Sequence, residues 1–196
     1  MFFLTITLYQ AIDAVSNNAK QDPTNLRALW GAIDKLGDQG YAQTQNSDRS
    51  AGNPNGTEKH INSNGSYVTL GANAPKCNIF VAAVYALGAG IGLKSAANPN
   101  GYPVNGRTWG QTFGVRSGNA NVPTTGDMFA GGLTNFNSTN APSPGDVVTN
   151  GHHVGINVGH EIVISATDGA GVNVGPMGTT LAPSQGPYKY LTYGKP

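Results

Sequence analysis

The sequence has few charged residues, little net charge and no long apolar run. Asp, Glu, Lys and Arg make up 11% of its 196 residues, against about 25% in an average domain, and the formal net charge is +1. A chain with so little positive charge is not suited to neutralising phosphates, so we expect no nucleic-acid partner. No apolar run reaches the ~18 residues of a membrane span, so we also expect no membrane partner.

Cysteine is almost absent as well. Cys77 is the only one, which excludes an internal disulfide. The single cysteine and the four histidines do not follow the spacing of a zinc motif, so we expect neither a metal nor another cofactor. The N-terminal stretch "MFFLTITLYQAIDAV" has no Lys or Arg before its apolar part, which is not typical of a secretory signal peptide. We therefore expect a soluble protein made in the cytoplasm without a signal peptide.

Glycine is abundant, with 28 residues, and clusters such as Asn-Gly and Asn-Pro favour short elements joined by turns. Residues 1–45 are predicted to form an N-terminal helical segment packed on the main domain. Its clearest helix is "DPTNLRALWGAIDKLG", with five apolar residues predicted on one face. These are Leu26, Leu29, Trp30, Ile33 and Leu36. Residues 46–65 are predicted to be a polar loop, and residues 66–196 the main domain.

Within the main domain, a buried helix is predicted to begin near Cys77, just after Pro75, and to end in the region from Gly88 to Gly92. Residues 93–145 are predicted to be mostly loop. Five short runs rich in Val, Ile and Tyr follow: "DVVTN", "HHVGINVG", "HEIVISATDG", "GVNVGP" and "YKYLTYG". They predict successive antiparallel strands, and helices followed by such strands indicate an α+β fold.

Two interpretations of Cys77 remain open from spacing and composition: a nucleophile or a buried core residue. At the first turn of a helix, its thiolate would be favoured by the helix dipole and by a neighbouring histidine. The candidate base is His153, which begins the alternating run His-Val-Gly-Ile, rather than the adjacent His152. His160 is assigned to a turn, and Asp146 is assigned a structural role.

Two segments resemble NlpC-type cell-wall cysteine peptidases and the related CHAP amidases. In "SYVTLGANAPKCNIFVAAVYALG", Tyr67 precedes Cys77, which opens a helix containing Phe80 and Val81. "SPGDVVTNGHHVGINVGHEIVISA" resembles the second motif of these families, a Gly-Asp strand start followed by a His-Val-Gly-Ile strand and a hairpin. The resemblance covers roughly residues 66–168 and implies a papain-like fold, with the nucleophile helix packed on an antiparallel sheet.

The resemblance also implies the roles of the site residues. Cys77 would be the nucleophile and His153 the general base, which later protonates the leaving amine. The Cys77 backbone N–H would help to hold the oxyanion. Tyr67 would add a hydroxyl donor or be a core aromatic residue. The family position that orients the histidine falls on Ser165, but Asp168 is the better electrostatic partner, so Asp168 is our first choice and Ser165 the alternative.

The substrates that the resemblance implies are amide bonds in peptidoglycan stem peptides, cut by an endopeptidase or amidase. Trp109 and Tyr102 would contact the substrate from the loops around "NPNGYPVNGRTWGQTFG", or else pack beneath a long loop. A hydrolase without a signal peptide or wall-binding repeats resembles the amidase toxins that bacteria inject into rivals. Such a toxin would act on the wall or in the periplasm of the target cell. Such toxins imply an immunity protein as a partner.

Two alternatives remain. One is a deamidase or transglutaminase on the same fold that acts on protein glutamines. The other is a non-catalytic binding module in which Cys77 belongs to the core.

Overall fold

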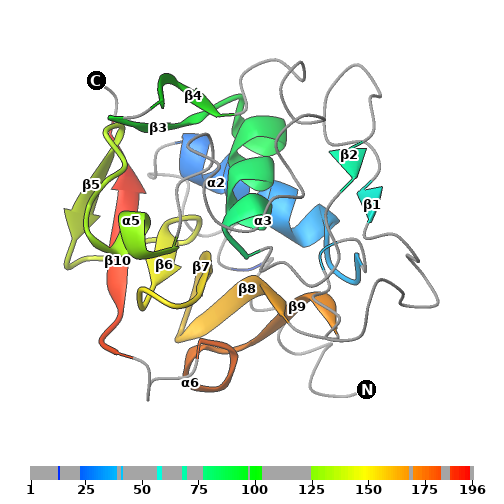
Figure 1. Ribbon diagram of the computed structural model, residues 1–196. Coiled ribbons are helices and arrows are strands. Elements are labelled where there is room, and N and C mark those ends of the chain that lie inside the picture. Colours follow the sequence, from blue (N-terminus) through cyan, green and yellow to red (C-terminus); the bar gives the residue numbers. More distant parts are fainter. Residues whose placement is uncertain are drawn as a thin grey trace.

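The computed structural model describes residues 13, 23–38, 41, 57–58, 68–69, 77–96, 98–102, 125–167, 170–181 and 186–194 (Figure 1). The helices and strands, in chain order, are α2 (Pro23–Asp34), β1 (Thr57–Glu58), β2 (Val68–Thr69), α3 (Cys77–Val84), the π-helical turn η2 (Tyr85–Ala89), β3 (Leu93–Ser95), β4 (Asn98–Tyr102), α5 (Thr125–Phe129), β5 (Phe136–Thr139), β6 (Val147–Thr149), β7 (Val154–Gly159), β8 (Ile162–Thr167), β9 (Gly171–Pro176), α6 (Met177–Thr180) and β10 (Lys189–Tyr193). No helix in these ranges is long and apolar enough to cross a membrane.

The main sheet has six strands in the order β5-β10-β6-β7-β8-β9. Every neighbouring pair in it is antiparallel. Strands β6 to β9 follow one another as a meander, and β10 returns from the C-terminal part of the chain to lie between β5 and β6. Together with the helices, this sheet confirms the α+β class and contains all five strands predicted for the last third of the sequence.

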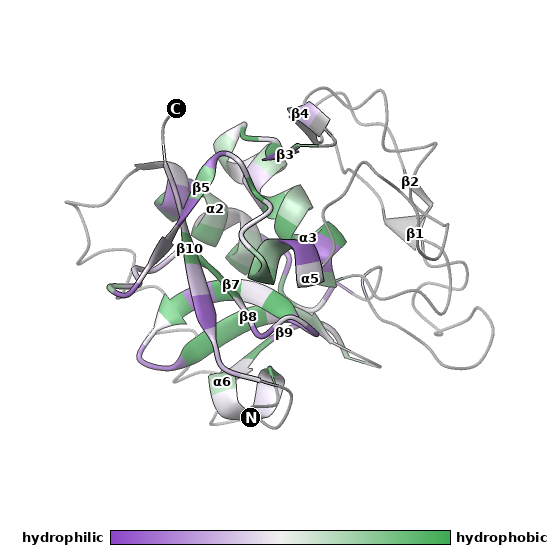
Figure 2. Ribbon diagram, turned by 60° about the vertical axis from the view of Figure 1, so that its left-hand side comes forward, coloured by the Kyte–Doolittle hydropathy of each residue, from purple (hydrophilic) through white to green (hydrophobic). Residues whose placement is uncertain are grey.

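The two faces of the sheet pack against different helices. On β8, Ile164 and Ala166 belong to the large core cluster that also contains the buried residues of α3. Val163 directly precedes Ile164 in sequence and belongs to a second cluster with Met177 of α6. Because successive side chains of a strand point to opposite faces, α3 covers one face of β8 and α6 the other. Figure 2 shows the hydrophobic colouring that β7, β8 and α3 share.

Helix α3 is buried because its sequence, CNIFVAAV, is apolar almost all round. It packs against β7 and β8, whereas η2 continues the same helix along α2. The helix ends at Gly90, whose φ of 70° is the left-handed conformation that glycine adopts without strain. Cys77 is the first residue of α3, the helix that packs against β7 and β8.

The predicted apolar face of α2 is wrong at one position. Leu29 is fully buried, but Trp30 is 49% exposed. Helices α2 and η2 approach each other closely at Gly31 and Gly88: a Cβ on Gly31 would lie 3.0 Å from the carbonyl oxygen of Val84. This close backbone approach leaves no space for an indole between the helices, so Trp30 lies outside the contact.

The predicted loop over residues 93–145 is also partly wrong, because it contains β3, β4, α5 and β5. β3 pairs with β4, and a bridge between Ser95 and Leu133 ties this hairpin to the chain that precedes β5. The sequence NPNGY of β4 has little intrinsic strand preference, because Pro and Gly are rare within strands. Only tertiary pairing makes this segment extended.

Candidate active site

His153 lies in the turn between β6 and β7, immediately before β7 begins. The turn includes Gly151, whose φ of 87° lies in the left-handed region that glycine adopts without strain. The Oγ1 of Thr149 accepts a hydrogen bond from the Gly151 N–H (3.1 Å) and donates one to the carbonyl oxygen of His153 (2.9 Å). The turn is further held by Thr125 of α5, whose hydroxyl donates to the Gly151 carbonyl at 3.0 Å. The backbone at His153 is therefore fixed from both sides.

The His153 ring contacts Ser165 in the neighbouring strand β8. The Ser165 Oγ lies 2.9 Å from His153 Nε2 and 2.7 Å from the carbonyl oxygen of Val154. A carbonyl only accepts, so the single hydroxyl proton of Ser165 goes to Val154. The Ser165 oxygen must then accept the proton of His153 Nε2, which assigns Nδ1 as the basic nitrogen of the neutral ring.

Gly155 makes room for this pair. It follows His153 by two residues in β7, and a Cβ on it would lie 2.6 Å from the Ile164 carbonyl oxygen and 3.0 Å from Ser165 Cβ. These distances are shorter than van der Waals contacts allow. A side chain on this residue would push β8, and Ser165 with it, away from β7.

Gly155→Ala is therefore expected to lower the free energy of unfolding by about 1–3 kcal/mol. Urea unfolding of the variant measures this loss. The matched control is Gly178→Ala in α6, because a Cβ on Gly178 meets nothing within 4 Å. We expect the control to stay within about 0.5 kcal/mol of the wild type. Equal losses in the two variants would contradict the packing argument.

Cys77 is the first residue of α3 and is 3% exposed. It belongs to the same core cluster as Val154, the residue after His153, and as Ala166, the residue after Ser165. The nucleophile predicted from the sequence therefore begins the helix that packs on the two strands that hold the His153–Ser165 pair.

Strand alternation places Ser165 on the α6 side of β8, with Val163, whereas α3 packs on the side of Ile164 and Ala166. His153 precedes β7, so its side-chain direction is set by the turn rather than by the strand. The ring reaches Ser165 through Nε2.

The other site residues expected from the sequence have different outcomes. Asp168, Tyr67 and Trp109 lie outside the described residues, as does the side chain of Tyr102. Ser165, the alternative orienting residue, contacts His153. His152 is exposed, and His160 lies in the turn between β7 and β8. Within the described ranges, no three His, Cys, Asp or Glu side chains are grouped as a metal site.

A second polar cluster surrounds Asp146, which is fully buried just before β6. Its carboxylate accepts hydrogen bonds from Asn25 Nδ2 of α2 at 2.8 Å and from the Ser143 N–H at 2.7 Å. Burial raises the pKa of Asp146 to about 6, against the lowering effect of its hydrogen bonds with Ser143 and Thr192. This carboxylate connects α2 to the sheet, as expected for a structural residue.

Sequence reasoning missed two partners in this cluster, Asn25 and Tyr85. The Tyr85 hydroxyl lies 2.6 Å from the carbonyl oxygen of Gly145 and 3.2 Å from Asn25 Oδ1. Asn25 Nδ2 also donates to Thr192 of β10 at 3.0 Å. No local signal identifies these residues, because their partners lie 60 or more positions away in the sequence.

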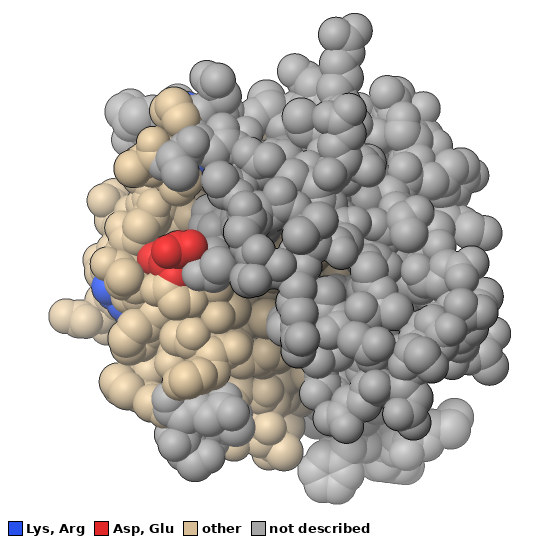
Figure 3. Space-filling model, in the orientation of Figure 1, with Lys and Arg blue, Asp and Glu red and all other residues tan. Residues whose placement is uncertain are grey.

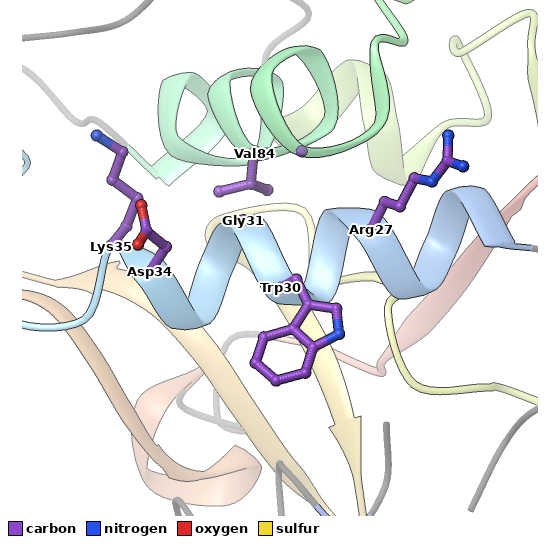
Figure 4. Close-up of a pocket in the computed structure, with 7 residues that line it drawn as sticks. Arg27, Trp30, Gly31, Asp34, Lys35 and Val84 are labelled. Carbon is purple, nitrogen blue, oxygen red and sulfur yellow. The ribbon is translucent and has the colours of Figure 1, made fainter. Parts of the chain in front are cut away.

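A groove of about 510 Å³ lies along α2, at its contact with α3 and η2 (Figure 4). Its lining consists of Arg27, Trp30, Gly31, Asp34, Lys35, Val84 and Gly88. Figure 4 shows the indole of Trp30 and the side chain of Val84 on opposite sides of α2, with Arg27 and Lys35 toward its two ends. The groove contains none of the site residues expected from the sequence.

Neither the described surface nor a comparison with known proteins identifies a function. In Figure 3, the described residues on that face are mostly uncharged, with one acidic patch and a few basic atoms. No protein-family model matches the sequence, and no curated protein or solved structure is similar to it. The α+β class therefore stands on the sheet and its helices, and function must be argued from the residues of the site.

Proposed function

We propose that this protein is a papain-like cysteine hydrolase of the NlpC/CHAP type that cleaves amide bonds in peptidoglycan stem peptides. The observation that supports the proposal is the contact between His153 Nε2 and Ser165 Oγ. Ser165 follows His153 by 12 residues and occupies the position at which the family resemblance places the residue that orients the histidine. The predicted nucleophile, Cys77, begins the helix that packs on the same two strands.

In the proposed reaction, His153 Nδ1 takes the proton of Cys77, and the thiolate attacks the amide carbonyl carbon. The resulting oxyanion is held by backbone N–H groups at the start of α3, where the helix dipole favours negative charge. The imidazolium then protonates the leaving amine as the C–N bond breaks. A water molecule, deprotonated by Nδ1, hydrolyses the thioester, which releases the carboxylate and restores the thiol.

Ser165 would orient the ring without adding negative charge. A carboxylate at this position would stabilise the imidazolium, whereas a hydroxyl that accepts from Nε2–H fixes the ring and the tautomer.

The experiment that tests the proposal is digestion of purified sacculi by the wild type and by Cys77→Ala, followed by mass spectrometry of the soluble fragments. We expect fragments from the wild type only, and their masses identify the amide bond that is cut. Sacculi of both wall chemistries should be used. If the wild type releases no fragments from either, the wall substrate is wrong, and deamidation of protein glutamines should be assayed next.

A further inference from the structure

We infer that Asn150 is a positioning residue for His153. Its side-chain amide determines whether the ring can contact Ser165 through Nε2 while Nδ1 accepts the proton of Cys77. The inference rests on the proposed function, because it assigns a role within the same reaction. Asn150 is 2% exposed and lies at the start of the turn between β6 and β7. Neither its residue type nor its place in the sequence marks it as part of a catalytic site.

The side chain of Asn150 uses both ends of its amide. Its Oδ1 accepts hydrogen bonds from the N–H of His152 at 3.1 Å and from the N–H of His153 at 2.8 Å. Its Nδ2 donates to the carbonyl oxygen of Leu181, a fully buried residue directly after α6. The amide plane is thus anchored in the core on one side and holds the histidine backbone on the other.

The backbone N–H of Asn150 adds one more hydrogen bond to His153. Its N–H donates to the carbonyl oxygen of His153 at 3.2 Å, the oxygen that also accepts from Thr149 Oγ1. The N–H and the C=O of His153 are therefore both bonded within the turn, and its Cα position is fixed relative to β6. Since Ser165 then fixes the ring through Nε2, the position of Nδ1 follows from these two restraints.

Of asparagine, aspartate, serine and alanine, only asparagine makes all three side-chain hydrogen bonds, to the N–H groups of His152 and His153 and to the Leu181 carbonyl. Aspartate has two acceptors but no donor for the Leu181 carbonyl. Serine can accept from an N–H two or three residues ahead but does not reach Leu181. Alanine leaves two backbone N–H groups and a buried carbonyl without their partner, which costs about 1–3 kcal/mol for each buried group.

The chain offers a matched control in Asn157, which lies in the same strand as Val154, toward the other end of β7. Asn157 is 3% exposed, and its Oδ1 accepts from the Gly159 N–H at 3.2 Å. Its Nδ2 donates to the Ser143 carbonyl at 3.0 Å. The two asparagines therefore match in burial and in the type of hydrogen bonds they make, but only Asn150 bonds to His153.

The test compares the wild type, Asn150→Ala, Asn150→Ser and Asn157→Ala in three measurements. Urea unfolding reports stability, and ¹⁵N NMR of labelled histidine reports the His153 tautomer and its Nε2–H bond. The pH profile of Cys77 alkylation by iodoacetamide reports the thiolate. We expect Asn150→Ala to lose the single tautomer, to move the alkylation profile toward that of an ordinary thiol and to lower sacculus hydrolysis by about 10- to 100-fold.

Asn150→Ser keeps an acceptor for the histidine N–H groups and should recover part of the loss, which keeps the test informative if the alanine variant gives little folded protein. Asn157→Ala should lower stability without changing the tautomer or the profile. Equal tautomer and alkylation profiles in Asn150→Ala and the wild type would overturn the inference. If wild-type Cys77 instead alkylates like an ordinary thiol, the proposed function fails, and the NMR measurement still decides whether Asn150 holds the ring.

Discussion

Replacing His153 with alanine is expected to lower the rate of sacculus hydrolysis by about 10²- to 10⁴-fold, the usual contribution of a general acid–base residue. His153 is the only histidine that contacts Ser165 in the described part of the chain, and the proposed reaction uses its Nδ1 twice. Without it, Cys77 would have to lose its proton to solvent. The measurement is the initial rate of fragment release from sacculi at neutral pH.

His152 provides the control for this variant. It is adjacent in sequence but exposed, so His152→Ala should keep close to the wild-type rate. Ser165→Ala should have a smaller effect, about 2- to 10-fold, because one neutral hydrogen bond contributes about 0.5–1.5 kcal/mol. A His152 variant that is as impaired as the His153 variant would contradict the assignment of the base.

Alkylation of Cys77 by iodoacetamide should also distinguish the wild type from His153→Ala, and this measurement needs no substrate. At about pH 6, an ordinary thiol is largely protonated, whereas a thiol paired with imidazolium is largely ionised. The lower nucleophilicity of a low-pKa thiolate offsets part of this gain, so the shape of the pH profile is more informative than the rate at one pH. We expect a plateau below about pH 8 in the wild type and a continuous rise toward pH 8.5 in His153→Ala.

The second large effect is on stability and concerns Asp146. Its pKa is raised from 3.8 to about 6 by burial, a difference that corresponds to roughly 3 kcal/mol. Between these two pH values the folded protein binds the proton and the unfolded chain releases it. The contribution of Asp146 to stability is therefore fully present below about pH 4 and is lost as the pH rises through about 6.

Asp146→Asn should remove this pH dependence. The amide keeps an acceptor for one of the two donors, Asn25 or Ser143, but does not ionise. We expect the difference in unfolding free energy between the wild type and the variant to change by up to roughly 3 kcal/mol between about pH 4 and pH 7, in the direction that favours the wild type at low pH. Urea unfolding across this range measures it.

The control is Asp34→Asn at the exposed end of α2, which should keep the wild-type slope. The same slope in Asp146→Asn and in the wild type would show that the buried carboxylate does not control this part of the pH dependence. A uniform loss of stability at all pH values in Asp146→Asn would assign it a hydrogen-bonding role alone.

Local sequence features determined much of the fold. The last third of the chain contains Val- and Ile-rich runs separated by Gly or by turn residues, and each run forms a strand. The apolar sequence after Cys77 forms a buried helix, and the α2 helix begins at Pro23. These features depend on residue type and spacing within a few positions, so they can be read without a structure.

Local sequence features predicted only part of the candidate site. The sequence alone selected His153 over His152 and placed both Ser165 and Asp168 near the expected third position. The contact of Ser165 with His153 depends on the register of β7 against β8, which pairs Ile156 with Ile164. Register is set by the packing of whole strands, so no local pattern fixes which side chain reaches the ring.

Three further features were decided by tertiary structure alone. Trp30 is exposed because two glycines bring α2 and η2 together, and the raised pKa of Asp146 comes from burial between segments distant in sequence. The Asn150 amide that bonds to His153 is itself held by the Leu181 carbonyl, which lies 31 positions away in the sequence. Periodicity and propensity act over one or two turns of chain, whereas burial, register and side-chain pairing depend on which distant segments the fold brings together.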